Sequence, residues 1–236
     1  MKRRLLAALL AVAATQFVAL GIWQIQRRAW KLDLITAVDR RIHAAAQPAS
    51  GPVAWPTLSA RAEAYTRVKA SGVLLNNCEV LVQAVTELGP GFWVLVPLRT
   101  DEGWTVLVNR GFVPPDRMVA ETRRAGEPVG RVTVTGLLRA PELGGAFLRN
   151  NDPEDNRWFS RDVAAIAATL GLGPVAPYFI DADATPNPGG YPVGGLTVVA
   201  FRNSHLVYAF TWFGLAALCG AGLWLLRTGC VEAEQL

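Results

Sequence analysis

The chain has 236 residues, 51% of them hydrophobic, and a formal net charge of +4. The apolar excess lies in one block at each end, which leaves room for one domain between the blocks. The sequence pI is about 9.2, but Lys and Arg gather beside the apolar blocks instead of forming a basic stripe. We therefore expect anionic lipid head groups or haem propionates as partners and no nucleic acid.

The first apolar run, Leu5 to Ile25, contains no charged residue and follows a basic start. It is long enough to span a bilayer, too long for the hydrophobic region of a signal peptide, and no small-x-small cleavage site ends it. We predict a transmembrane helix with its basic flank over residues 1–31. Residues that suit a membrane interface stand at its end: Trp23, Arg27, Arg28, Trp30 and Lys31.

Residues 32–202 are expected to form one extracytoplasmic domain. A 3.6-residue period continues from Asp33 to about Ala46, so the first helix should extend, or restart, outside the membrane. His43 falls in this stretch, too far from the bilayer to face His205 across a haem. Residues 47–56 read as a linker because they are rich in Pro, Gly and Ser.

Beyond this linker the apolar period changes to two, which predicts strands. The expected strands are Ala64–Leu75, Val80–Glu87, Phe92–Arg99, Thr105–Phe112 and Arg131–Arg139. Residues 76–77 and 101–103 are expected to form hairpin turns, and residues 89–91 to break the chain between two strands. This pattern predicts an antiparallel β-sheet or small barrel.

The end of the domain should hold a short helix at Asp162–Leu170 and closing strands at Tyr178–Asp181 and Thr197–Phe201. Between these strands, Asn187–Gly195 is expected to be a flexible surface loop; it lacks the GK[ST] of a phosphate loop. The predicted fold class is thus an α+β membrane protein, with two transmembrane helices flanking a sheet or barrel domain that carries one or two helices.

The second apolar run has no Lys, Arg, Asp or Glu between His205 and Arg227. It predicts a transmembrane helix at 203–227, with 228–236 as a cytoplasmic tail, because the run reaches roughly the 30 Å of a hydrocarbon core. His205, Tyr208 or Ala209, and Trp212 recur at helical spacing and can share one face. An imidazole at this depth is a candidate haem ligand, although a polar cap within an aromatic belt is the alternative.

The charges beside the two helices are nearly balanced, so they decide the topology weakly. Because long loops translocate regardless of charge and the first helix usually dominates, we expect both termini in the cytoplasm. No GxSxG or HExxH accompanies either histidine, and Cys78, Cys219 and Cys230 contain no CxxC pair. The chain is therefore not expected to be an enzyme, to bind zinc or to form a disulfide framework.

Three segments in order carry a family-like pattern: Leu20–Gln24 with Arg27, Trp30 and Lys31; Val108–Pro114; and Asn203–Trp212. Together they resemble the surfeit locus protein one family of cytochrome c oxidase assembly factors, over roughly residues 17–213. Asn151–Asp162 is similar to the family pattern before its helix. Phe112 stands where Trp is usual, and Ser204 where a second Asn is common.

The resemblance implies a two-helix protein of the cell inner membrane with a periplasmic domain, or of the mitochondrial inner membrane in a eukaryote. It implies that the protein binds haem a and helps deliver it to the oxidase catalytic subunit, with haem a synthase as a further candidate partner. His205 matches the position assigned to haem ligation. The alternative is a haem-free scaffold that stabilises an oxidase subunit during assembly.

The candidate site follows from this match. His205 would be the axial iron ligand, and Trp23, Tyr208 and Trp212 would form an apolar wall beside the ring. Guanidinium groups that suit the propionates are expected near the same surface: Arg27, Arg28 and Arg202. Because only one axial histidine is available, the other iron position would be empty or weakly held, which favours hand-over over storage.

Overall fold

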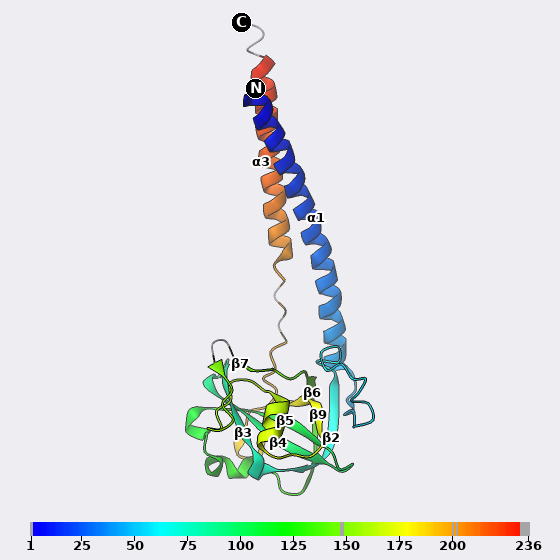
Figure 1. Cartoon of the computed structure of the whole chain (residues 1–236), viewed down its shortest axis with the longest axis vertical. Coiled ribbons are helices and arrows are strands. Elements are labelled where there is room, and N and C mark those ends of the chain that lie inside the picture. The colour runs from blue at the N-terminus through cyan, green and yellow to red at the C-terminus, as the bar shows by residue number, and fades with distance from the viewer. Residues whose placement is uncertain (1, 147–148, 200, 202, 232–236) are drawn as a thin grey trace. The chain divides into compact units, whose positions relative to one another are not determined.

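The computed structural model describes residues 2–146, 149–199, 201 and 203–231. The chain divides into two compact units, Met1–Ala37 with Val199–Leu236 and Val38–Val198. The first unit consists of long helical segments, and the second is a β-rich domain (Figure 1).

The two long helices are α1, Lys2–His43, and α3, His205–Val231. Both are long and apolar enough to cross a membrane. Helix α1 runs without a break to His43, which confirms that the first helix extends beyond its apolar run. Most apolar side chains of both helices are exposed, Leu5 at 64% and Val207 at 67% for example, as expected for surfaces that face lipid.

The domain is built on a closed barrel of five strands. These are β2 (Arg67–Leu74), β6 (Arg131–Arg139), β9 (Val175–Ala182), β5 (Thr105–Val113) and β4 (Gly89–Thr100), in that spatial order, with β4 pairing back onto β2. Strands β1 (Gln47–Pro48) and β3 (Val80–Thr86) extend the sheet, and β7 (Gly145–Ala146) pairs with β8 (Arg149–Asn150). The barrel alternative was therefore correct, but β5 and β9 run parallel, so the sheet is not purely antiparallel.

Alternate residues of the barrel strands enter two separate cores, as the period of two requires. The inward core includes Val94 and Val96 of β4, together with Tyr178 of β9. The outward core includes Leu95 of β4 and is covered by α2, Val163–Thr169, and by Trp158. The Asp162 side chain caps α2 by accepting a hydrogen bond from the Ala165 amide, 3.2 Å long, so the predicted helix is confirmed.

Two predicted turns were wrong. Residues 89–91 lie within β4 and pair with β3, whose hairpin turn is at residues 87–88. Pro90 is tolerated there because β5 reaches β4 only from Phe92 onward, which leaves this end of β4 with one neighbour. Asn76 and Asn77 lie in a 3-10 turn, Asn76–Cys78, that joins β2 to β3, and these two strands pair with other strands instead of with each other.

Two expectations for the end of the domain were also wrong. No strand forms at residues 197–199 or 201, and residue 200 lies outside the described residues. The segment Asn187–Gly195 is not a free surface loop, because Val193 and Phe112 exchange two main-chain hydrogen bonds of 2.9 Å. The main-chain groups of Phe112, beyond the last residue of β5 that pairs with β9, are thus bonded to Val193. This segment therefore takes the place next to β5 that a closing strand would have filled.

Candidate functional site

His205 is the first residue of α3, and its ring is held by α1. The imidazole Nδ1 lies 2.7 Å from the amide oxygen of Gln24. Because an amide oxygen only accepts, this contact fits the tautomer that carries its proton on Nδ1 and its lone pair on Nε2. Among the described residues none is bonded to Nε2. The ring is half-buried, so Nε2 is the nitrogen that remains for a ligand.

The rest of this face of α3 packs against α1. Trp212 stacks on Phe17 with ring centroids 5.6 Å apart, and Ala209 is only 2% exposed. Gly21 lies against the ring of Phe213, where a Cβ atom on Gly21 would be 2.6 Å from Cε1 of that ring. The small residue is therefore what lets the two helices approach each other here.

The predicted aromatic wall is only partly assembled. His205 and Trp212 share the face that contacts α1, and Ala209 lies between them, whereas Tyr208 is 55% exposed beside that face. The indole of Trp212 is occupied by Phe17, so it is not an open stacking surface. At about 100° per residue, positions 208 and 209 lie about equally far to either side of the direction midway between 205 and 212. Helix α3 is rotated so that the side of Ala209 and Phe213 faces α1, which leaves Tyr208 exposed.

Of the arginines expected near the propionates, the structure describes Arg27 and Arg28. The Arg27 guanidinium lies 4.0 Å from the centroid of the Trp30 ring, and Arg28 is half-buried. Trp23 is 52% exposed. Arg202 lies outside the described residues.

Gln24 is the functional candidate that sequence reasoning missed. The sequence offers Gln24 only as part of a motif, because a second amide, Gln16, lies in the same apolar run and the pattern does not distinguish the two. Asn203, two residues before the ligand candidate, adds a second polar group, since its Oδ1 is buried without a partner among the described residues. Buried polar atoms of this kind are rare, and they mark places where a ligand or water completes the bonding.

The domain contains a separate buried charge cluster centred on Asp181, which is 3% exposed. Its carboxylate accepts hydrogen bonds from four side chains 2.8–3.1 Å away: Asn109, Arg139, Arg161 and Thr197. Arg161 also forms a two-pronged ion pair with Glu142. Burial by itself would raise the pKa of Glu142, but the hydrogen bonds and charge of Arg161 lower it below its ordinary value. Since two carboxylates balance two guanidiniums, this cluster is best explained as structural.

Arg110 of the second family-like segment is also buried, in a central strand. One of its terminal nitrogens donates to the Gly126 carbonyl at 2.5 Å and to Asn187 Oδ1 at 2.7 Å. Burial lowers its pKa from the ordinary value. The contacts show that Arg110 fixes the segment that begins at Asn187.

Comparison with known proteins agrees with the family resemblance that the ordered segments carry. The model of the SURF1 family matches residues 11–217. Surfeit locus protein 1 of Mus musculus is 37% identical over 226 residues, covering 89% of this chain and 71% of that protein. The Homo sapiens protein is 37% identical over 227 residues, 89% of this chain and 73% of its own. The Takifugu rubripes protein is 36% identical and is covered over 91% of its length. This chain therefore belongs to the SURF1 family.

Proposed function

We propose that this protein is a membrane-embedded assembly factor for haem-copper cytochrome c oxidase, which binds haem a through His205 and helps deliver it to the oxidase catalytic subunit. It acts in the inner membrane with its domain on the outer, periplasmic side, and it is not an enzyme. The observation that carries the proposal is the 2.7 Å contact between His205 Nδ1 and Gln24. A ligating histidine characteristically donates its other ring N–H to a fixed acceptor, which sets the tautomer and the ring orientation.

The residues around His205 fit a haem that lies on one flank of the helix pair. The helices α1 and α3 run antiparallel. Side chains that are rotated about their own helix axis in the same sense, away from the contact between the helices, therefore lie on the same side of the helix pair. Seen along the helix axis, Arg27 lies roughly 90° before the middle of the α1 face that contacts α3. Tyr208 lies about as far before the middle of the α3 face that contacts α1. Arg27 and Tyr208 therefore lie on one flank, and Trp23 lies close by on the same side.

On this flank each residue has a definable task. His205 Nε2 would bind the iron, and Tyr208 and Trp23 would supply apolar surface for the ring. Arg27, one turn after Trp23 and just beyond the apolar run, would pair with a propionate, and its stacking on Trp30 already orients the guanidinium. The haem is cargo, whose redox chemistry begins only in the oxidase. A single protein ligand permits its release.

The first test measures haem in protein purified in detergent from cells that make haem a. We expect a Soret band at stoichiometric haem in the wild type and its loss in His205→Ala. His43→Ala is the matched control, because His43 is exposed and the partner of its ring among the described residues is Asp39, in its own helix turn. Equal haem content in His205→Ala and in the control would rule out the ligand role.

A second variant tests the contact that carries the proposal. Gln24→Leu removes the acceptor of Nδ1 but keeps an apolar side chain of similar size in the helix. We expect haem affinity to fall by about 10–100-fold, the effect typical of losing the hydrogen-bond partner of a ligating histidine. Titration with haem a into the purified protein, followed by absorbance, measures this change. Unaltered affinity would mean that Gln24 does not position the ligand.

A haem-free scaffold is the second candidate, and the packing of the helix pair favours it. Phe17 and Gly21 cover Trp212 and Phe213 on the face that carries His205, so this part of α3 is already occupied by protein. In this case the His205–Gln24 contact is a hydrogen bond that holds the two helices together. A colourless purified protein that still restores oxidase assembly to a deletion strain would establish the scaffold and exclude the carrier.

A further inference from the structure

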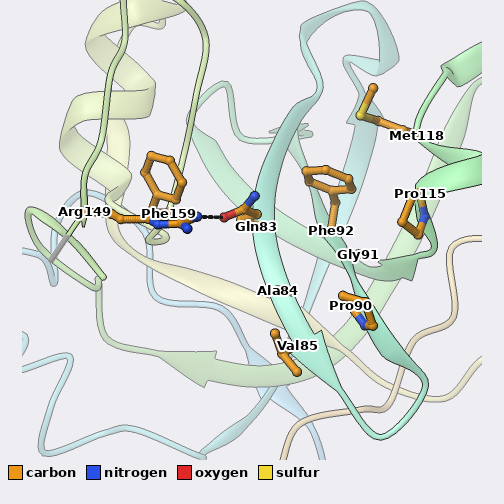
Figure 2. A pocket seen from close by; sticks show the side chains of 10 residues that line it. All are labelled: Gln83, Ala84, Val85, Pro90, Gly91, Phe92, Pro115, Met118, Arg149 and Phe159. Carbon is orange, nitrogen blue, oxygen red and sulfur yellow. Dashed lines mark hydrogen bonds between the residues drawn. The ribbon is translucent and has the colours of Figure 1, made fainter. Parts of the chain in front are cut away.

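Beyond the membrane helices, the domain carries an apolar groove along strand β3. The groove has a volume of about 710 Å³, and its lining includes Gln83, Phe92, Met118 and Phe159. Figure 2 shows Arg149 and Phe159 on one side of the β3 backbone, and Phe92, Pro115 and Met118 on the other. Two of the lining residues are unusually open, Val85 at 85% and Met118 at 42% exposed, and Leu88 in the turn that follows β3 is 56% exposed. Exposed apolar surface gathered in one place is typical of an interaction site.

Strand β3 lies at one end of the seven-stranded sheet, so among the described strands none pairs with its outer edge. Within the described part of the chain, Trp158 bonds to this edge: its carbonyl accepts a 2.8 Å hydrogen bond from the amide of Gln83. The chain then turns away, because the amides of Phe159 and Ser160 both donate to Asn151 Oδ1. The part of the β3 edge that follows Gln83 therefore lies beside the groove, which Val85 lines.

The direction of the backbone groups on this edge follows from the ladder. In an antiparallel pair, alternate residues point their N–H and C=O groups toward the partner strand and away from it. The amide of Gln83 points away from β4, so the amide of Val85, two residues further along the strand, points away from β4 as well. Pro90 stands opposite Val85 and has no amide to offer, which agrees with this parity. The Gln83 carbonyl and both main-chain groups of Val85 are therefore directed outward, where a further strand would bind them.

The charge at the groove indicates what kind of strand fits. Arg149 is exposed, donates to the neutral Gln83 side chain at 2.9 Å and lies 5.4 Å from the centroid of the Phe159 ring. No carboxylate among the described residues forms an ion pair with it. A guanidinium left unneutralised at the side of an apolar groove complements a carboxylate on the incoming chain.

We propose that this edge is a docking site for an extended, acidic segment of a partner protein, which adds a strand to β3. Main-chain hydrogen bonds to Gln83 and Val85 would supply affinity, apolar side chains of the segment would enter the groove, and a carboxylate would pair with Arg149. This inference goes beyond haem binding and is independent of it, since it uses no residue of the helix pair.

The test uses the full chain in detergent and a fluorescent, capped seven-residue peptide of alternating valine and glutamate. Fluorescence anisotropy measures binding, and hydrogen exchange of residues 80–86 reports where the peptide lies. We expect binding with slower exchange of these amides. A peptide with lysine in place of glutamate, and one methylated on alternate backbone nitrogens, should each bind at least about fivefold more weakly, the loss of one ion pair or main-chain hydrogen bond.

Two variants locate the site. Val85→Pro removes an outward N–H without breaking a bond to β4, so the domain should fold and binding should fall by roughly five- to tenfold. Val85→Thr keeps the N–H and should bind like the wild type. Arg149→Gln should lower the affinity for the glutamate peptide and leave the affinity for the lysine peptide unchanged.

Three results would overturn the proposal. They are equal binding of the methylated peptide, equal binding by Val85→Pro, and protection of β3 by dimerisation of this chain in the absence of peptide. The last result would mean that the edge pairs with a second copy instead of a partner protein.

Discussion

The cluster around Asp181 allows a stability prediction with a worked magnitude. Replacing Asp181 by Asn keeps the size of the side chain but removes the charge that two guanidiniums share. In this variant Arg161 keeps its ion pair with Glu142, whereas Arg139 loses its ion pair with the carboxylate at position 181. Removing one partner of a buried ion pair costs about 3–5 kcal/mol, because the other charge stays buried without compensation. For a domain of this size, that loss lowers the melting temperature by roughly 6–20 °C.

Thermal unfolding of the full chain in detergent, followed by near-ultraviolet circular dichroism of the domain's aromatic residues, measures this change. Asp101→Asn is the matched control, because Asp101 forms a 2.7 Å ion pair with Arg131 in which the side chains are 44% and 66% exposed. An exposed pair contributes about 1 kcal/mol or less, so the control should shift the transition by no more than roughly 4 °C. If Asp181→Asn and Asp101→Asn shift it equally, the buried cluster does not stabilise the domain as argued.

Two further predictions concern Glu142 and Gly21. Because Arg161 lowers the folded-state pKa of Glu142, the stabilisation by Glu142 is complete above its ordinary pKa of 4.5 and is lost as the pH falls through the lowered value. Urea unfolding should therefore show Glu142→Gln destabilised at pH 7, with a difference that shrinks toward pH 3; a constant difference would contradict this linkage. Gly21→Leu should separate the two apolar helices, because its side chain would collide with Phe213. At Gly214 an added Cβ atom meets no other atom within 4 Å, so Gly214→Leu should leave the helices in place. Spin labels on the two helices report this separation, and equal distances in both variants would show that Gly21 does not set the approach.

Much of the fold could be predicted because it is encoded locally. The two membrane-type helices follow from uninterrupted apolar runs, and strand β6 was predicted with its observed bounds because alternation and flanking breakers coincide there. The turn at residues 101–103 was also correct, since Gly103 has a φ of +88°, which glycine adopts readily. Residues 89–91 were misread because Gly and Pro also occur at strand ends that have only one neighbour.

The candidate site could be predicted only in part. The sequence identified His205, since a single imidazole in an apolar run is conspicuous by itself. It could not identify Gln24 as the partner, because the two residues are 181 positions apart and only the antiparallel packing of α1 and α3 brings them together. It also could not tell whether Tyr208 or Ala209 shares the contact face, because that depends on how α3 is rotated against α1.

The sequence by itself determined the two apolar helices, the intervening β-rich domain and the histidine at the start of α3, because periodicity and hydropathy are properties of neighbouring residues. Tertiary structure decided the parallel pairing of β5 with β9, the convergence of Asn109, Arg139 and Arg161 on Asp181, and the pairing of the His205 imidazole with Gln24. The physical reason is the same in each case. Hydrogen bonds and ion pairs depend on distances between groups that only chain closure brings together, and no local pattern records those distances.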